Sequence, residues 1–353
     1  MPYNMKMKYF KSVIVNVLIL FFLSPINLLV ASTDPFQKQP VNKYITHSKL
    51  PANNVIRYQS QLRPDSDKSK LSIISPDYQK IVNKENQDKT PLSIYTRAIN
   101  EQPEIADMVY INRGNTFFAL NNLVKARKDY SSAIKVNPKY DVAYYNRGLM
   151  NYLLGDYVKS FLDYKKAIKL NPSIELAHNN IGLINHKKGK YHKAIDSFSK
   201  ELKINPNNLD YYICSNKTYD GDNQQISSSF YFLEPKYGVT YYNCGNSFYE
   251  LGNYSKAIVN YNRAIKLEPN LSFSASYNMA ISYLVLKKYE QSIISFNNVI
   301  KINPKYIQAY TYRGTAFYRL GDIAKACKDA KIAVKLGSFV LIDALKEKGY
   351  CKK

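Results

Sequence analysis

The sequence predicts an all-α protein, a solenoid of helix–turn–helix repeats, and three observations lead to this fold class. Gly114, Gly148 and Gly182 recur every 34 residues, each preceded four positions earlier by Tyr or His. Alanine and aromatic residues follow at fixed distances, and a proline closes each segment. Repetition at this period is typical of helical hairpins that stack into an array. We therefore interpret the 353 residues as an array rather than as two or three globular domains.

Residues 238–269 show the repeat most completely. They carry, in order, Tyr241, Gly245, Phe248, Gly252, Ala257, Tyr261, Ala264 and Pro269. This order closely resembles the tetratricopeptide repeat (TPR), and the same skeleton recurs over roughly two thirds of the chain. The resemblance implies a right-handed α-solenoid in which each repeat contacts only its neighbours, ended by a C-terminal capping helix.

The repeated residues have structural explanations. The first glycine and the alanines let two helices approach closely, and the large aromatic residues fill the space between successive helix pairs. The glycine before Asp156, Asn253 or Asp322 allows the left-handed conformation that ends a first helix. Asn-Pro or Glu-Pro then ends the second helix.

The N-terminus indicates an export signal. Three lysines within the first eleven residues precede an apolar run at 13–23, and residues 29–32 offer small side chains for cleavage. We predict a cleaved signal peptide over residues 1–32 and export through the secretory pathway, to the periplasm or outside a bacterial cell. The alternative is an uncleaved N-terminal membrane anchor, because residues 13–31 are barely long enough to span a bilayer. No other segment is apolar enough, so the mature chain is expected to have no transmembrane domain.

The segment between this signal and the first complete repeat contains two parts. Residues 33–71 are polar, contain four prolines and have no period, so we expect a disordered or loosely attached arm. Residues 72–106 match only the second half of a repeat. Thr90-Pro91 resembles a helix start with proline at its first position, whereas Pro76 interrupts the preceding helix. We expect a degenerate N-terminal repeat that caps the solenoid.

The rest of the chain divides at its closing prolines. Residues 107–206 contain three TPR units, 207–237 form a shortened degenerate repeat, 238–338 contain three more units, and 339–353 form the capping helix. The shortened repeat has lost about four residues at its inner turn. At this point we expect the solenoid to continue with a local defect or to bend.

A charged pair accompanies three of the repeats. An arginine directly before the first glycine is matched by an aspartate sixteen residues later, as Arg113–Asp129, Arg147–Asp163 and Arg313–Asp329. Where the arginine is replaced, by Ile181, Cys244 or Met279, the aspartate is replaced too. Because a partly buried charge requires a partner, this pattern predicts an ion pair between the two helices of a repeat.

An asparagine recurs two positions before the first glycine or before the alanine that replaces it. By the resemblance to TPR proteins this position faces the concave groove, where an amide can both donate to and accept from the backbone of an extended peptide. The alternative is that the recurrence merely reflects the repeat. With its aromatic and amide neighbours, the predicted peptide-binding set is Asn112, Asn115, Tyr145, Asn146, Tyr152, Asn180, Tyr242, Asn243, Asn246, Tyr249, Tyr277 and Asn278.

Basic residues dominate the chain, with 50 Lys and Arg against 27 Asp and Glu, a net charge of +23. A lysine near the end of each second helix, with Arg263 and other basic residues, is expected to form a stripe on the convex side. The six lysines are Lys135, Lys169, Lys203, Lys266, Lys301 and Lys335. The stripe is either a solvated face that complements the helix dipoles or a weak attraction for anionic polymers or membrane surfaces.

No pattern in the sequence indicates catalysis. The four Cys and four His lack the close spacing of metal ligands, and neither a phosphate-binding loop nor a nucleophile elbow occurs. We therefore expect a protein without enzyme activity, cofactor or metal. Cys327 and Cys351 are a candidate disulfide, feasible if the chain is exported, and Cys214 and Cys244 are a weaker one. Free thiols are the alternative for both pairs.

Two functions remain open from the sequence. The first is a protein–protein interaction scaffold that binds a peptide or protein segment in its concave groove outside the cytoplasm. The second is a convex face that binds an anionic polymer or membrane surface, with nucleic acid not expected. The identity of a partner is not encoded in any motif.

Overall fold

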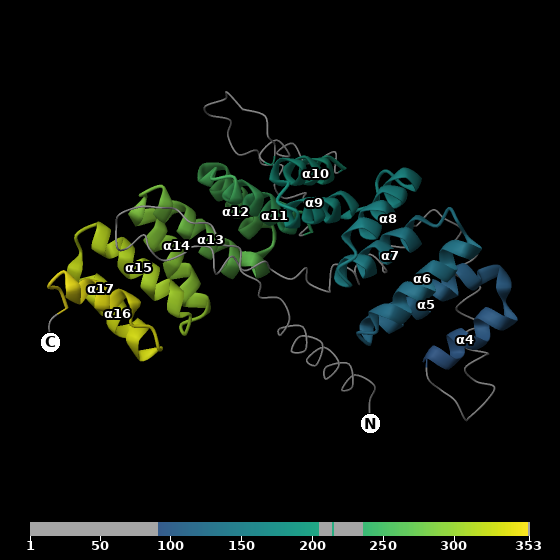
Figure 1. Ribbon diagram of the computed structural model, residues 1–353, viewed down its shortest axis with the longest axis horizontal. Coiled ribbons are helices and arrows are strands. Elements are labelled where there is room, and N and C mark those ends of the chain that lie inside the picture. Colours follow the sequence, from purple (N-terminus) through teal and green to yellow (C-terminus); the bar gives the residue numbers. More distant parts are fainter. Residues whose placement is uncertain (1–90, 205–213, 215–235, 352–353) are drawn as a thin grey trace.

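The computed structural model describes residues 91–204, 214 and 236–351. Within these ranges the chain is built from α-helices with short 3-10 turns, and no strand occurs. The helices follow one another along an arch from α4 to α17 (Figure 1). The predicted all-α solenoid is confirmed. The predicted signal peptide, the polar arm and most of the degenerate N-terminal repeat lie outside the described residues.

Each repeat consists of two antiparallel helices, and each helix packs against the next along the chain. The helices before the shortened repeat are α4 (Pro91–Glu101), α5 (Ala106–Ala119), α6 (Leu123–Val136), α7 (Asp141–Leu153), α8 (Tyr157–Leu170), α9 (Ala177–Lys187) and α10 (Tyr191–Ile204), with the 3-10 helix η2 (Pro103–Ile105) after α4. Those after it are α11 (Lys236–Glu250), α12 (Tyr254–Leu267), η5 (Pro269–Leu271), α13 (Ser272–Val285), α14 (Tyr289–Ile302), α15 (Ile307–Arg319), α16 (Ile323–Lys335) and α17 (Val340–Glu347).

The first glycine of a repeat marks the crossing of its two helices. A Cβ atom at Gly114 would lie 2.7 Å from the ring of Tyr130, and one at Gly245 would lie 2.7 Å from the ring of Tyr261. Both tyrosine side chains are fully buried. The large aromatic residue of the second helix therefore occupies the space that a side chain on the first helix would need.

The turn within a repeat uses glycine and a capping side chain. Gly155 has a φ of +84°, which ends α7 in the left-handed conformation, and the side chain of Asp156 then accepts a hydrogen bond from the backbone N–H of Lys159 at 3.1 Å. Two repeats lack this glycine, and there Asn121 and Lys287 take the left-handed position, each with a φ of +59°. The left-handed backbone conformation of the turn is therefore kept where another residue replaces the glycine.

The asparagine of Asn-Pro links the two ends of a repeat. The side-chain amide of Asn137 donates to the carboxylate of Asp107 at 2.8 Å, and that of Asn171 donates to Asp141 at 2.6 Å. In both cases the acceptor lies in the first turn of the same repeat. The bond therefore ties the end of a second helix back to the start of its first helix.

The C-terminal helix α17 closes the solenoid. Leu341 and Leu345 are buried against the last repeat, and Leu341 occupies the space above Gly314. Ala330 stands in that repeat where the others have a large aromatic residue, so a leucine from the cap fills the gap instead. Among the described residues, no helix combines the length and apolar character that a membrane span requires.

Candidate functional site

Three ion pairs join the first helix of a repeat to its second helix. In each, Nε and one terminal nitrogen of the arginine donate to the two carboxylate oxygens of the aspartate, at 2.6 to 3.0 Å. The pairs are Arg113–Asp129, Arg147–Asp163 and Arg313–Asp329. The aspartates are buried, and each guanidinium also lies 5.4 to 5.5 Å from the ring centre of a tyrosine one turn earlier. The ion pairs predicted from the sequence are confirmed.

Repeats without the arginine use other bonds at the same place. Ser197, Asn260 and Ser295 replace the aspartate, and each donates to the backbone carbonyl four residues earlier on its own helix. Cys244 replaces an arginine and forms a disulfide with Cys214. Repeats that lose the arginine therefore lose the aspartate as well, so neither charge of the pair is left buried without its counter-ion.

The recurring asparagines form hydrogen bonds between repeats. Nδ2 of Asn180 on α9 donates to the hydroxyl of Tyr145 on α7 at 3.2 Å, and Nδ2 of Asn278 on α13 donates to that of Tyr242 on α11 at 3.3 Å. Both donors are 3% exposed. In these two repeats the amide N–H groups thus contact the preceding repeat.

At two interfaces the recurring asparagine also donates to an asparagine of the preceding repeat. Oδ1 of Asn246 accepts from the hydroxyl of Tyr261 at 2.9 Å and from Asn278 at 3.0 Å. Asn115 holds the same place in the first repeat, where Oδ1 accepts from Tyr130 at 2.7 Å and from Asn146 at 3.5 Å. This polar network connects the core of one repeat to the first helix of the next.

Most of the predicted peptide-binding residues are buried, and several of them belong to this network. Asn112, Asn115 and Tyr152 are partly exposed. Burial raises the pKa of Tyr152 to about 12, so its hydroxyl is neutral and able to donate at physiological pH. The remaining nine are at most 7% exposed: Tyr145, Asn146, Asn180, Tyr242, Asn243, Asn246, Tyr249, Tyr277 and Asn278. Their role in binding stays a prediction.

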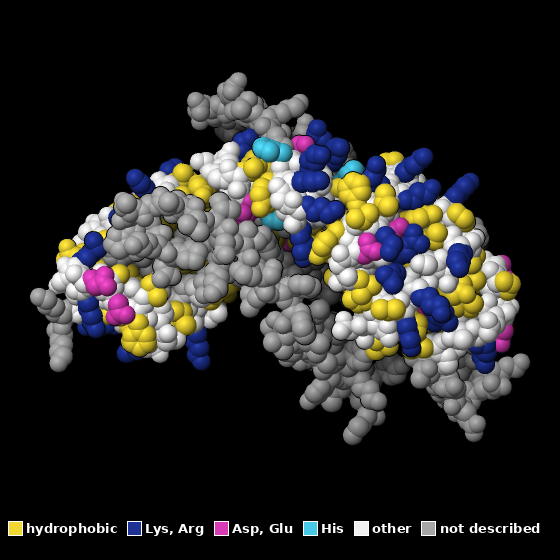
Figure 2. Space-filling view, in the orientation of Figure 1, with side chains coloured by type: hydrophobic (Ala, Val, Ile, Leu, Met, Phe, Trp, Pro, Cys, Tyr) yellow, Lys and Arg dark blue, Asp and Glu magenta, His cyan; other side chains and the backbone are white. Residues whose placement is uncertain are grey.

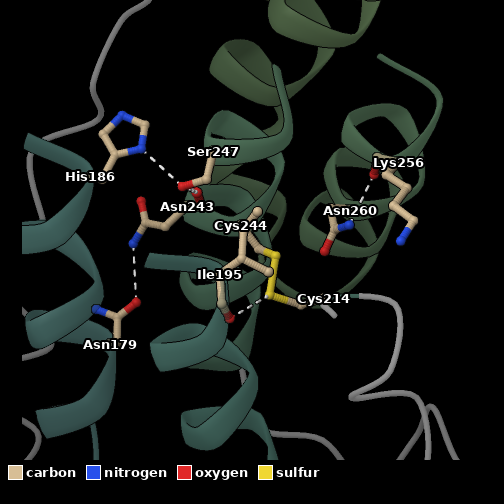
Figure 3. Close-up of a disulfide and its surroundings, with 9 residues drawn as sticks. All are labelled: Asn179, His186, Ile195, Cys214, Asn243, Cys244, Ser247, Lys256 and Asn260. Carbon is tan, nitrogen blue, oxygen red and sulfur yellow. Dashed lines mark hydrogen bonds between the residues drawn. A yellow bond between two sulfur atoms is a disulfide. The ribbon is translucent and has the colours of Figure 1, made fainter. Parts of the chain in front are cut away.

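The junction around the shortened repeat has the same arrangement. Nδ2 of Asn243 on α11 donates to Oδ1 of Asn179 on α9 at 3.1 Å, and Nδ1 of His186 lies 2.9 Å from the hydroxyl of Ser247 (Figure 3). Asn179 stands in its repeat where Tyr145 and Tyr242 stand in theirs. Helix α11 therefore packs on α9 as the first helix of the next repeat would, although 31 residues (205–235) separate α10 from α11.

A disulfide borders this junction. Cys214 is bonded to Cys244 on α11, and its Sγ lies 3.8 Å from the backbone carbonyl oxygen of Ile195 on α10 (Figure 3). A second disulfide joins Cys327 on α16 to Cys351, so all four cysteines are paired. Other than Cys214, Lys236 and Tyr237, the predicted shortened repeat at 207–237 lies outside the described residues.

A buried glutamate near the junction had no sequence prediction. Glu201 on α10 is 1% exposed, and its carboxylate accepts hydrogen bonds from the backbone N–H groups of Leu176, His178 and Asn179, at 2.5, 3.1 and 3.2 Å. Burial raises the pKa of Glu201 to about 7, against the opposing effect of these hydrogen bonds. The sequence marks it only by the change from alanine to glutamate, because Glu201 occupies the position that Ala167 holds in the preceding repeat.

The lysine stripe is exposed on the second helices. All six of its lysines are solvent-exposed. In Figure 2 Lys and Arg side chains are spread among hydrophobic ones over the visible face of α5 to α10, with few Asp or Glu. The expectation that Arg263 belongs to this stripe is wrong, because Arg263 is 4% exposed, and burial lowers its pKa to about 10.

Ionisable groups do not gather into a metal site in the described part of the chain, where no group of three or more His, Cys, Asp or Glu side chains has a suitable arrangement. The partly exposed side chains of the first helices include amides and aromatic rings, such as those of Asn112, Asn115 and Tyr152, beside ionisable groups such as Arg113, His178 and His186. Amides and aromatic rings suit hydrogen bonding and packing.

Solved structures of other proteins have the same fold. PilF of Pseudomonas aeruginosa is 14% identical with a TM-score of 0.52, over 69% of this chain and 98% of PilF. The C-terminal part of a TPR repeat-containing protein from Cytophaga hutchinsonii is 17% identical with a TM-score of 0.52, over 72% and 93%. PilW, described as a widely conserved type IV pilus biogenesis factor, is 14% identical with a TM-score of 0.50, over 68% and 98%. No curated protein matched the sequence.

Family models identify the repeats themselves. Models described as tetratricopeptide repeat match residues 142–174, 176–208, 239–271 and 273–306, and a model described as TPR repeat matches residues 114–155. The matched segments contain nearly all of helices α6 to α14 and the end of α5. The chain therefore carries tetratricopeptide repeats, and these repeats build its solenoid.

Proposed function

We propose that the chain is a non-enzymatic interaction scaffold whose first helices hold a peptide or protein segment of a partner. The observation that carries this proposal is the continuous contact between successive first helices, held by the amide and tyrosine network. Asn180 reaches Tyr145 across one interface, and Asn278 reaches Tyr242 across another. A row of helices fixed in this way presents a preorganised surface, which lowers the entropic cost of binding.

The residues of this surface divide into two roles. The partly exposed Asn112, Asn115 and Tyr152 contact the partner, the amides by hydrogen bonds to its backbone and the aromatic ring by packing. The buried Tyr145, Asn180 and their equivalents do not contact the partner; they hold the first helices in place and so contribute to binding indirectly. An extended segment suits such a surface because its backbone offers unpaired N–H and C=O groups along its whole length.

Site-specific photo-crosslinking tests the proposal. A benzophenone side chain replaces Tyr152 on α7, and the protein is irradiated in an extract of the compartment from which it comes. The matched control carries the same group at Val158 on α8, which is 63% exposed. We expect a crosslinked partner from position 152 that is absent from position 158. Equal capture at both positions, or capture only at 158, would overturn the assignment to the first helices.

The exposed lysines favour a second candidate, an anionic polymer or membrane surface bound by the second helices. Six lysines at equivalent places repeat a positive charge along the solenoid. Binding of this kind decreases steeply with salt and is lost when Lys169, Lys203 and Lys266 are changed to Glu. Crosslinking at position 152 that survives these three changes favours the first candidate.

Export is a further part of the proposal. The basic and apolar start of the chain resembles a signal peptide. Two disulfides among the described residues support an oxidising compartment, because cytosolic thiols are kept reduced. N-terminal sequencing of the protein from its native cell tests this: a mature chain that begins near residue 33 supports cleavage, and one that begins at Met1 contradicts it.

A further inference from the structure

A hollow of about 690 Å³ lies at the C-terminal end of the solenoid, between α16, α17 and the residues that follow α17. None of its lining residues lies on the first helix of a repeat. Its apolar lining includes Val334, Ile342, Phe339 and Tyr350. Phe339 is 57% exposed and Tyr350 is 38% exposed, so two large rings face solvent beside the hollow. Aromatic groups exposed next to a cavity are typical of an interaction site.

The hollow is also basic. Lys331 and Lys335 from α16 and Lys346 from α17 line it, and no Asp or Glu does. Asp343 and Glu347 on α17 lie outside the lining. None of the three lysines forms an ion pair with another residue of the described segments. Three unpaired cations around an apolar floor create a positive potential that favours an anionic ligand.

The wall of the hollow is fixed in place. Cys351 lines it and is joined to Cys327 on α16, which holds the chain end beside that helix. The ring of Tyr350 meets the ring of Tyr318 edge to face, with their centres 6.1 Å apart. A surface held by a disulfide and an aromatic contact loses little freedom on binding.

We propose that this hollow binds an acidic amphipathic segment of a partner protein, with an apolar side chain in the hollow and carboxylates facing Lys331, Lys335 and Lys346. An apolar centre with a polar rim is the usual composition of a protein interface. The exposed rings at its edge leave the hollow open, whereas small-molecule sites enclose most of their ligand. A second copy of this chain is disfavoured by like-charge repulsion, since the net charge is +23.

The probe for this site is a fluorescein-labelled helical peptide with Glu on one face and Leu and Phe on the other. Two matched peptides carry Gln in place of Glu, or Ser in place of Leu and Phe. Fluorescence anisotropy with the full chain is expected to show binding of the first peptide only. Changing Lys335→Glu and Lys346→Glu together is expected to weaken binding about tenfold or more. Phe339→Ser is expected to weaken it similarly through the apolar anchor.

The chain supplies its own control variant. Lys266 and Lys301 hold the same place in their repeats as Lys335, away from the hollow. The change Lys266→Glu/Lys301→Glu alters the net charge equally and is expected to leave peptide binding unchanged. Thermal unfolding of each variant verifies that the cap remains folded. Equal weakening by both charge reversals would overturn the proposal, as would equal binding of the Gln peptide.

Two further experiments test the proposal, one by removing the disulfide and one by offering a membrane surface instead of a peptide. The variant Cys327→Ser/Cys351→Ser releases the wall and leaves Cys214–Cys244 intact, so it is expected to weaken binding of the acidic peptide while Lys301→Glu does not. Vesicles of phosphatidylglycerol are the alternative anionic probe. If they bind through Lys335 and Lys346 while the acidic peptide does not bind, the site belongs to a lipid surface and the proposal is overturned.

Discussion

Arg147 on α7 and Asp163 on α8 form a two-point ion pair, with nitrogen–oxygen distances of 3.0 and 2.6 Å. A third bond comes from Nδ2 of Asn151, 2.9 Å from the same carboxylate. Oδ1 of Asp163 thus accepts from the guanidinium, and Oδ2 accepts from both the guanidinium and the amide. The carboxylate is buried, and burying it without its cation would cost folding free energy. The two residues therefore depend on each other.

We predict that Arg147→Leu destabilises the protein by about 3 kcal/mol, because Asp163 then remains buried without its cation. The double variant Arg147→Leu/Asp163→Ser, which copies the residue types that follow in the next repeat, is expected to recover much of this loss. Urea unfolding monitored by circular dichroism measures both. Equal destabilisation in the single and double variants would show that the pair is not coupled.

The hydrogen bond between Asn180 and Tyr145 gives a second prediction. Tyr145→Phe removes the acceptor of a buried amide N–H and is expected to cost about 1 kcal/mol or more. Tyr144→Phe removes the hydroxyl of the preceding, more exposed tyrosine and serves as the control, with an expected change within about 0.5 kcal/mol. If the two variants unfold at the same urea concentration, the interface does not depend on this bond.

Glu201 predicts a particular dependence of stability on pH. Its pKa is raised from 4.5 to about 7 in the folded chain. Between these values the folded state binds more protons than the unfolded state, so stability decreases as pH rises. The contribution is fully present below about pH 4.5 and is lost as pH rises through about 7.

The variant Glu201→Gln isolates this contribution. It keeps a carbonyl oxygen as acceptor for the backbone N–H groups and does not titrate. The difference in unfolding free energy between wild type and Glu201→Gln should decrease by at most about 1.4 kcal/mol for each pH unit over that range. Glu290→Gln, at an exposed glutamate on α14, is the control and should show no such trend. A difference that increases with pH would mean that the hydrogen bonds outweigh burial.

The disulfides are tested by counting thiols. In denaturant without reductant we expect no reactive thiol, and after reduction four, because both cysteine pairs are closed. Changing Cys327 and Cys351 together to Ala is expected to cost about 3 kcal/mol on the chain-entropy model, mainly in the capping helix. Two or four thiols before reduction would show that one or both bridges are open in solution.

The sequence carried enough information for the repeats but not for the contacts between them. The Arg147–Asp163 pair was predictable because its two residues change together from repeat to repeat. The partners of Asn180 and Asn278 were not, because a contact with the preceding repeat depends on how repeats stack. From the sequence, their recurrence therefore fits either a ligand contact or a simple consequence of the repeat, and neither alternative specifies a bond to the preceding repeat.

Glu201 shows a different limit to prediction from sequence. Most repeats have alanine at this place, and its replacement by Glu201 or Val299 does not reveal what the new side chain contacts. The three backbone N–H groups that surround it become identifiable only when the start of α9 is placed beside α10. Predictions for the three structural residues Gly114, Gly148 and Gly182 were more secure, because close helix crossing needs no information beyond the repeat itself.

The junction between α10 and α11 supports a last prediction. Asn243 donates to Asn179 as Asn180 donates to Tyr145, so α11 already occupies the place of a neighbouring repeat. We predict that residues 205–235 can be replaced by the linker Asn137–Tyr140, which joins α6 to α7, with Cys244→Ala to remove the unpaired thiol. The solenoid should keep its interface because α9 and α10 contact α11 directly.

This replacement is expected to leave a single cooperative unfolding transition, measured by circular dichroism in urea, since stability in a solenoid is carried by contacts between neighbouring repeats. The matched control is the full chain with Cys244→Ala alone, which separates the loss of the disulfide from the loss of the segment. If the control unfolds in one transition and the shortened chain in two, residues 205–235 contribute contacts that couple the halves. If both unfold in one transition at similar urea concentrations, the interface of α9 and α10 with α11 is sufficient by itself.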